Sequence, residues 1–261
     1  MKTLRLDHAV LHYRIDGPAD GRPVLFANSL GTDLRVWSTL LPLLPEGLRL
    51  IRYDKPGHGL SDAAPAPYTI AGLSAEAAAL LDHLGLRDVT VIGLSIGGMI
   101  AQDMAARRPD LLRAMVLMDT AAQIGTAQMW QDRIDAVRAG GIASLAEAVL
   151  ARWFAPAFHR DRADELALWR NMLCRTTVEG YSGCCAAIAE ADLSATTRAL
   201  TLPAMAMAGS ADGATPPDLV RATAEMMGAP FHLIEGAGHL PCVEAPEQVA
   251  ALLTRFLEQT A

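Results

Sequence analysis

The chain has 261 residues, 51% of which are hydrophobic, and its formal net charge at pH 7 is −7. A chain of this length can bury a large core within a single α/β domain. The charge disfavours nucleic acid as a partner, because neutralising phosphates needs clustered lysine and arginine and the chain has only two lysines. An anionic small molecule would have to be attracted by a local arginine instead.

No run of about eighteen apolar residues is free of charge, and the first residues lack the apolar block of a signal peptide. We therefore expect a cytoplasmic protein with no membrane partner. The four cysteines have no metal-ligand spacing, and adjacent Cys184 and Cys185 are poor disulfide partners for each other. Reduced thiols are expected for all four.

The predicted elements begin with strands. Residues 4–6 and 9–15 are expected to form an opening hairpin, and the continuous apolar run 23–27 indicates a strand that is buried on both faces. A helix is predicted over residues 36–43 and another strand over 48–53.

Strands and helices alternate through most of the remaining chain. The expected strands are 88–92, 114–118, 203–208 and 231–235, and the expected helices are 70–84, 99–108, 217–227 and 246–257. Residues 120–200 carry helical periodicity without a strand signal, which predicts an inserted helical cap. The alternation in 1–119 and 201–261 predicts a core with a mostly parallel eight-stranded sheet and helices on both faces.

The strand at 88–92 leads into Gly93-Leu94-Ser95-Ile96-Gly97, which is the G-x-S-x-G pattern. In a strand-turn-helix context the two glycines permit a turn so tight that side chains at their positions would clash. Ser95 is thereby pushed outward at the carboxyl edge of the sheet. We predict that Ser95 is a nucleophile.

A serine hydroxyl needs a neighbouring base, and His239 is the best candidate among the seven histidines. It lies in a glycine-rich loop after the last predicted strand, whereas the turn around His58 is explained by its prolines and glycines. An orienting carboxylate completes such a triad, and Asp212 satisfies the chain order Ser, Asp, His. Asp119 is the alternative, since it also follows a strand at this edge.

Attack by Ser95 would create an oxyanion that needs hydrogen-bond donors. The amide of Ile96 is one candidate, because it lies at the start of the helix that follows the turn. The loop after strand 23–27 should supply the second donor, for which Leu30 is the candidate.

Several motifs extend the pattern along the whole chain. They are the turn around Ser95, the segment 53–62 (Tyr-Asp-Lys-Pro-Gly-His-Gly-Leu-Ser-Asp), Asp212 and the loop 236–239 (Gly-Ala-Gly-His). Together they resemble the α/β-hydrolase superfamily. Residues 28–32 (Asn-Ser-Leu-Gly-Thr), the Gly-Leu-Ser-Ile-Gly-Gly turn and Arg152-Trp153-Phe154 make the chain similar, within that superfamily, to the 3-oxoadipate enol-lactonases.

This resemblance implies hydrolysis of the enol-lactone of 3-oxoadipate, in protocatechuate and catechol degradation, without a metal or organic cofactor. The substrate would be a small anionic lactone whose carboxylate pairs with a cap arginine. Arg133 is the candidate, since it lies one helical turn from Trp130; a solvated surface arginine is the alternative. Trp130 and Trp153 either touch the ligand or pack the cap.

Other functions fit the same residues. A general carboxylesterase or a cofactor-free haloperoxidase-like hydrolase would use the same triad under a different cap. A catalytically silent ligand receptor would use the pocket without chemistry. The sequence leaves open whether the protein is a monomer or a small homo-oligomer.

Overall fold

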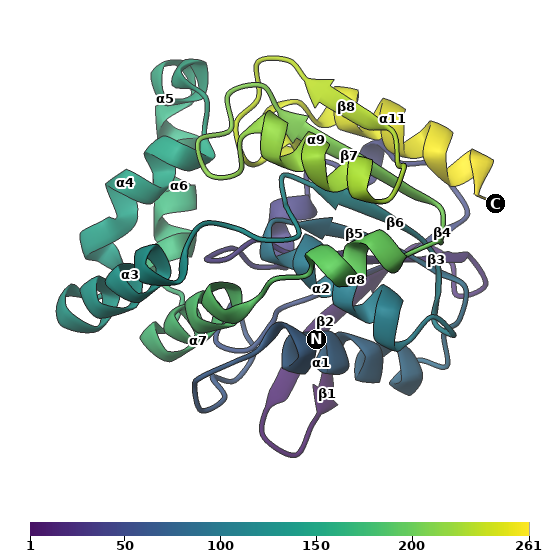
Figure 1. Ribbon diagram of the computed structural model, residues 1–261, viewed down its shortest axis with the longest axis horizontal. Coiled ribbons are helices and arrows are strands. Elements are labelled where there is room, and N and C mark those ends of the chain that lie inside the picture. The colour runs from purple at the N-terminus through teal and green to yellow at the C-terminus, as the bar shows by residue number, and fades with distance from the viewer. Residues whose placement is uncertain (261) are drawn as a thin grey trace.

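The computed structural model describes residues 1–260, which form an eight-stranded sheet with helices on both faces (Figure 1). The strand order is β1-β2-β4-β3-β5-β6-β7-β8; β1 with β2 and β2 with β4 pair antiparallel, and all other neighbours run parallel. The strands are β1 Lys2–Arg5, β2 Val10–Asp16, β3 Arg22–Ala27, β4 Leu48–Tyr53, β5 Val89–Leu94, β6 Leu112–Met118, β7 Ala204–Gly209 and β8 Phe231–Ile234. The predicted fold class, an α/β-hydrolase fold with a mostly parallel sheet, is confirmed.

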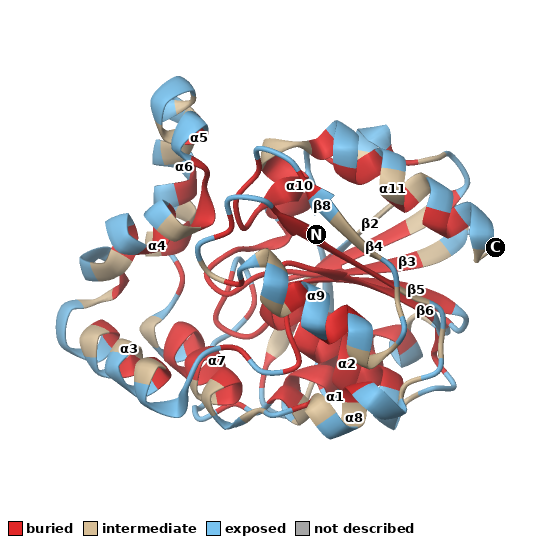
Figure 2. Cartoon of the chain, turned by 45° about the horizontal axis from the view of Figure 1, so that its top comes forward, coloured by how far each residue is buried: buried red, intermediate tan, exposed pale blue. Residues whose placement is uncertain are grey.

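The central strands are buried because helices cover both faces of the sheet (Figure 2). Every residue of β5 is buried, as expected for a continuous apolar run in a parallel sheet. Helices α1, α2, α8 and α9 lie on one face, and α10 and α11 lie on the other. Their bounds are α1 Ile70–His83, α2 Ile96–Arg107, α8 Ser194–Ala199, α9 Pro217–Met226, α10 Pro241–Glu244 and α11 Pro246–Gln259.

The final helix shows how its sequence selects one face. Its buried residues Val249, Leu253, Phe256 and Leu257 recur at helical spacing and belong to the hydrophobic core. Burying each leucine or phenylalanine side chain contributes about 1.5–3 kcal/mol. None of the helices in residues 1–260 combines sufficient length with sufficient hydropathy to span a bilayer.

The helix predicted over 36–43 is wrong. The segment instead forms two short 3₁₀ turns, Leu34–Trp37 and Leu41–Leu43. Pro42 has no amide hydrogen and cannot continue an α-helical hydrogen-bond ladder, which explains the interruption. Trp37 is nevertheless fully buried and donates to the Asn28 side chain at 2.7 Å.

The chain between β6 and β7 is helical and lies mostly to one side of the sheet, at the left in Figure 1. Its elements are α3 Ala127–Gly140, a 3₁₀ turn Ile142–Leu145, α4 Ala146–Trp153, α5 Pro156–Asp161, α6 Ala163–Cys174 and α7 Val178–Glu190, followed by α8. The division into core and cap at residues 119 and 200 stays a prediction. Helix α8 packs on α2, where the Thr197 hydroxyl donates to Oε1 of Gln102 at 2.6 Å.

Candidate active site

The turn that carries Ser95 is strained and is held by the neighbouring strand. Ser95 lies between the end of β5 at Leu94 and the start of α2 at Ile96, with φ of +57°. A positive φ in a residue with a Cβ atom typically costs about 1–3 kcal/mol at such sites. The Ser95 amide donates to the Met118 carbonyl at 2.9 Å, and the Thr120 hydroxyl donates to the Ser95 carbonyl at 2.6 Å. These bonds hold the turn in place.

The glycines of the motif are required by close approach of the backbone. A Cβ atom on Gly93 would lie 2.3 Å from the carbonyl oxygen of Gly97. One on Gly97 would lie 2.0 Å from the carbonyl oxygen of Ala27 in β3. No side chain fits at either position, so the tight turn predicted from the glycine spacing is present.

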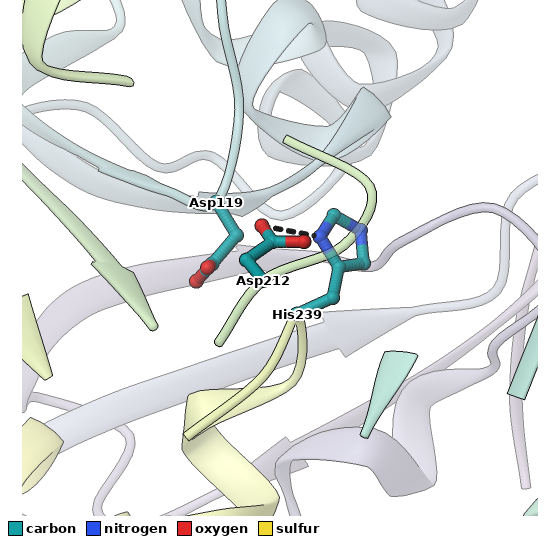
Figure 3. Close-up of side chains that lie close together, drawn as sticks. All are labelled: Asp119, Asp212 and His239. Atoms are coloured by element: carbon teal, nitrogen blue, oxygen red, sulfur yellow. Dashed lines mark hydrogen bonds and ion pairs between the residues drawn. The ribbon is translucent and has the colours of Figure 1, made fainter. Parts of the chain in front are cut away.

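Loops after β7 and β8 bring Asp212 and His239 together (Figure 3). Nδ1 of His239 lies 2.9 Å from Oδ2 of Asp212, and both side chains are almost fully buried. A carboxylate only accepts, so Nδ1 carries the proton and Nε2 is left as the basic nitrogen. This is the tautomer that a general base acting on a serine requires.

Asp212 is held as an anion by the turn that follows it. Its Oδ1 accepts from the amides of Ala214 at 2.7 Å and Thr215 at 3.0 Å, and its Oδ2 accepts from the Thr215 hydroxyl at 2.7 Å. Burial alone would raise the pKa of Asp212, but the His239 imidazole and these hydrogen bonds outweigh it and hold that pKa below its ordinary value. Asp212 is therefore suited to stabilise an imidazolium.

Asp119, the alternative carboxylate, lies beside this pair (Figure 3). Its Oδ1 accepts from the Gly209 amide at 2.8 Å, and its buried Oδ2 has no hydrogen-bond partner within residues 1–260. Burial and then the negative charge of Asp212 raise the pKa of Asp119 well above its ordinary value. The ligating atoms of Asp119, Asp212 and His239 lie within 4.8 Å of one another, which is close enough to hold a metal ion. Nδ1 of His239 instead donates its hydrogen to Asp212.

Ser95 and His239 line one small cavity of about 80 Å³. Nε2 of His239 lies 3.5 Å from the Ser29 hydroxyl, and in the described residues no hydrogen bond joins it to the Ser95 hydroxyl. Catalytic hydrogen bonds are often long without substrate and tighten in the complex. Larger surface hollows, of about 430 and 780 Å³, lie against the N-terminal hairpin and contain neither residue.

The two amides predicted for the oxyanion hole are free to donate. Leu30 lines the cavity, and Ile96 is the first residue of α2, directly after Ser95. Within residues 1–260, neither the Leu30 amide nor the Ile96 amide donates a hydrogen bond. Free amides beside a nucleophile are what an oxyanion hole requires, and the start of α2 adds a positive dipole end.

The cap supplies two arginines to the same cavity, Arg133 from α3 and Arg152 from α4. Within residues 1–260, neither forms a salt bridge with a carboxylate. Burial and the nearby Arg133 guanidinium lower the pKa of Arg152 from its ordinary value. The cavity therefore holds two neighbouring positive charges whose mutual repulsion a bound anion would relieve.

The two predicted tryptophans also line this cavity. Trp130 donates from its ring nitrogen to the Ile124 carbonyl at 2.6 Å, and the guanidinium of Arg133 lies 5.0 Å from the centroid of the Trp130 ring. Trp153 holds its carbonyl oxygen 2.8 Å from the His239 amide, which donates to it. Both residues thus belong to the wall around the candidate base.

His58 is occupied by backbone groups. Its Nδ1 donates to the Pro56 carbonyl at 2.9 Å, and its Nε2 accepts from the Gly31 amide at 3.1 Å. Burial and the nearby Lys55 ammonium lower the pKa of His58 well below its ordinary value. This neutral imidazole, with both ring nitrogens hydrogen-bonded to the backbone, supports the turn that carries it.

Four polar residues of the site were missed or left unassigned by sequence reasoning: Ser29, Arg152, Tyr181 and Thr215. Thr215 had a usable signal, because a loop aspartate often accepts from backbone amides just after it in sequence, which places residue 215 beside the Asp212 carboxylate. Ser29 stood in a loop that was expected to carry ligand-binding groups. The sequence contained no signal that separates Arg152 from the other cap arginines.

The comparison with known families adds a match over most of the chain. Residues 22–246 match the model of a family described as alpha/beta hydrolase fold. The chain belongs to this alpha/beta hydrolase family. The resemblance predicted from the motifs is thereby confirmed, and the protein is a hydrolase of this fold.

Relatives similar to the hydrolase over its full length include lactonases and an esterase. It is 33% identical to 3-oxoadipate enol-lactonase 2 of Acinetobacter baylyi, over 97% of each chain. It shares 34% identity and a TM-score of 0.95 with the structure of an enol-lactonase from Burkholderia xenovorans LB400, covering 98% of this chain and 100% of that one. A thermophilic esterase from Thermogutta terrifontis, described with malate bound, shares 26% identity and a TM-score of 0.93, covering 100% and 99%.

Proposed function

We propose that this hydrolase opens the enol-lactone of 3-oxoadipate by covalent catalysis at Ser95, with His239 as the base and Asp212 as the carboxylate that orients His239. The proposal is supported by the strained turn at Ser95, by the basic Nε2 that the bond to Asp212 leaves on His239, and by the cavity that Ser95 and His239 share.

In the first half-reaction, the Ser95 hydroxyl attacks the ring carbonyl of the lactone while Nε2 of His239 takes its proton. The tetrahedral oxyanion accepts hydrogen bonds from the Leu30 and Ile96 amides; such a donor typically contributes about 3 kcal/mol. Collapse breaks the ring C–O bond, and the imidazolium returns the proton to the departing enol oxygen. The enol then tautomerises to the ketone.

In the second half-reaction, water attacks the acyl group on Ser95. Nε2 of His239 takes a proton from the water, and the second tetrahedral intermediate expels the Ser95 oxygen, which regains a proton from the imidazolium. One water is consumed, and both ends of the opened chain carry a carboxylate. Asp212 stabilises the imidazolium in both steps.

The single observation that carries the choice of an anionic substrate is the pair Arg133 and Arg152. Both line the cavity of Ser95, and neither pairs with a carboxylate within residues 1–260. A free carboxylate on the lactone would neutralise this local charge with charge-assisted hydrogen bonds. Full-length similarity to two enol-lactonases supports the same substrate, and an esterase relative described with malate, a dicarboxylate, supports an anionic one.

The test is to measure kcat/KM of the purified protein for the enol-lactone and for p-nitrophenyl acetate, with the acid product identified by mass spectrometry. The proposal predicts 3-oxoadipate as the product and a kcat/KM for the lactone that exceeds that for the neutral ester by at least about 100-fold, or 2.7 kcal/mol. Faster turnover of the neutral ester would instead make the protein a general carboxylesterase. Lack of turnover, together with no labelling of Ser95 by a fluorophosphonate, would indicate a receptor.

A further inference from the structure

The mechanism above makes no use of Glu244, a partly buried carboxylate at the end of α10. Its Oε1 accepts from the Gly238 amide at 2.7 Å, directly before His239. Its Oε2 accepts from the Ala155 amide at 2.9 Å, between α4 and α5. One carboxylate thus bonds both the loop of the proposed base and the helical region above it.

Further backbone bonds join the same two parts of the molecule. Residues 152–155, here called the cap strap, lead from the end of α4 to the start of α5. The His239 amide donates to the Trp153 carbonyl at 2.8 Å. The Gly213 amide donates to the Arg152 carbonyl at 3.3 Å, and Nε of Arg152 donates to the Gly213 carbonyl at 3.0 Å. The strap therefore contacts the loops of both Asp212 and His239.

The backbones of these two segments lie so close together that no side chain fits between them at Gly238. A Cβ atom on Gly238 would lie 2.6 Å from the Trp153 carbonyl oxygen and 2.9 Å from Oε1 of Glu244. Backbone groups that meet at this distance are held by hydrogen bonds, and buried amides are costly when unpaired. Glu244 supplies the acceptors for two of these amides.

We propose that Glu244 is a positioning residue, which holds the His239 loop against the cap strap so that Nε2 can reach the Ser95 hydroxyl. The inference rests on the proposed roles of Ser95 and His239, but it does not depend on the identity of the substrate. Small displacements of a catalytic group reduce rates strongly, about 100-fold for 1 Å. Losing the Glu244 bonds should therefore lower the rate at Ser95 more than substrate affinity.

The surroundings of Glu244 act on its pKa in both directions. Burial raises the pKa of Glu244 to about 7, and the negative charge of Asp212 also raises it. The two amide hydrogen bonds and the Arg162 guanidinium lower this pKa, but less than burial raises it. Arg162, from the cap side, also donates to the Val243 carbonyl at 3.3 Å. A protonated carboxyl group would lose one of its two acceptors, so the bonds should weaken as the pH falls through about 7.

The first test is Glu244→Gln, which keeps the shape but turns one acceptor into an N–H donor facing an amide. We expect kcat for p-nitrophenyl acetate and the rate of Ser95 labelling by a fluorophosphonate to fall between about tenfold and 100-fold, with KM nearly unchanged. The acid limb of the log(kcat/KM) profile should lose one ionisation and become less steep. Deuterium exchange should rise in residues 236–240 and 152–158.

Glu247→Gln is the matched control, because Glu247 is an exposed glutamate in the first turn of α11, three residues after Glu244. It should behave as wild type.

A second variant, Ala155→Pro, removes the amide hydrogen on the strap side and puts the proline Cδ atom in its place, so that Oε2 of Glu244 loses its donor and must move away. Ala155 has φ of −62°, and Phe154 before it is extended at ψ of 142°, so proline fits the backbone at this position. Glu244 can then still accept from the Gly238 amide but no longer from the strap, so it no longer joins the two segments. We expect slower labelling of Ser95 and faster exchange in 236–240.

If both variants fold with wild-type melting temperatures and leave labelling, pH profile and exchange unchanged, the role assigned to Glu244 is wrong. Failure of the wild type on the enol-lactone, with normal turnover of p-nitrophenyl acetate, would overturn the proposed substrate alone. If the wild type reacts with neither ester nor fluorophosphonate, the proposed chemistry fails and Glu244 has no base to position. The exchange measurement would then still report whether Glu244 joins the two segments.

Discussion

The strand edge that carries Ser95 and the helical region that carries Arg133 and Arg152 contribute to one cavity by different physical means. At the strand edge, geometry comes from the backbone: Ser95 has a positive φ, and glycines at 93 and 97 have no room for a Cβ atom. The helical region contributes long charged side chains and tryptophan rings. Close backbone packing sets the geometry of the strand edge, whereas the helical region contributes charge and aromatic surface.

This difference separates the reaction from the choice of substrate. The turn, the two free amides and the bond from His239 to Asp212 are suited to any ester carbonyl. In the proposed function, the guanidinium groups of Arg133 and Arg152, which form no salt bridge with a carboxylate within residues 1–260, would select for negative charge. Substitution of Ser95, Asp212 or His239 should therefore lower turnover of every ester, whereas substitutions among the cap arginines should change only the preference between esters.

The largest effect is expected for Ser95→Ala, which removes the proposed nucleophile. Loss of a serine nucleophile in a triad lowers kcat on the order of 10⁶-fold, so turnover of lactone and neutral ester should both fall close to background. The fluorophosphonate should no longer label the protein, as intact-protein mass spectrometry would show.

Ser29→Ala is the matched control for that variant, because the Ser29 hydroxyl lies 3.5 Å from Nε2 of His239. Ser29 lacks the strained turn and the helix start that follow β5, so its loss should preserve labelling. Loss of labelling in Ser29→Ala, with retention in Ser95→Ala, would exchange the roles of the two serines.

A smaller effect is expected when the orienting acid is replaced. Asp212→Asn should lower kcat about 10⁴-fold, because the amide can present a donor to Nδ1 and stabilise the wrong tautomer. Asp119→Asn should change kcat little, since the raised pKa of Asp119 already favours a neutral group and an amide oxygen can still accept from Gly209. Kinetics on p-nitrophenyl acetate measure both. A large loss in the Asp119 variant alone would assign the acid to Asp119.

The strand edge was predictable from the sequence because its signals are local. The spacing of Gly93, Ser95 and Gly97 within a strand-turn-helix pattern specified the turn, and the alternation of strands and helices predicted the sheet. The bond between Asp212 and His239 followed from two loops after parallel strands, whose carboxyl ends share one edge.

The helical region was harder to predict because its contacts join distant residues. Arg152 is oriented by a bond to Gly213, sixty-one positions away, and Glu244 joins residues 155 and 238. Periodicity places such residues on helices but does not say which ends of the chain they meet. A single residue also overrode the periodicity at 36–43, where Pro42 interrupted the expected helix.

The smallest effect, and the most specific, is expected for the cap arginines. Arg133→Ala and Arg152→Ala should each raise KM for the anionic lactone about tenfold, equivalent to about 1.4 kcal/mol, because one of two cations that face the carboxylate is lost. KM for p-nitrophenyl acetate should stay close to the wild-type value. Steady-state kinetics with both substrates would measure this difference.

Arg138→Ala is the matched control for the arginine variants, since Arg138 lies on α3 with Arg133 but is exposed and does not line the cavity. It should leave KM for both substrates unchanged. Equal losses for lactone and neutral ester in the Arg133 variant would mean that the guanidinium supports the wall around Trp130 and does not select charge. Arg133 would then not contribute to selection of the anionic substrate, and of the two cavity arginines only Arg152 would remain as the residue that selects charge.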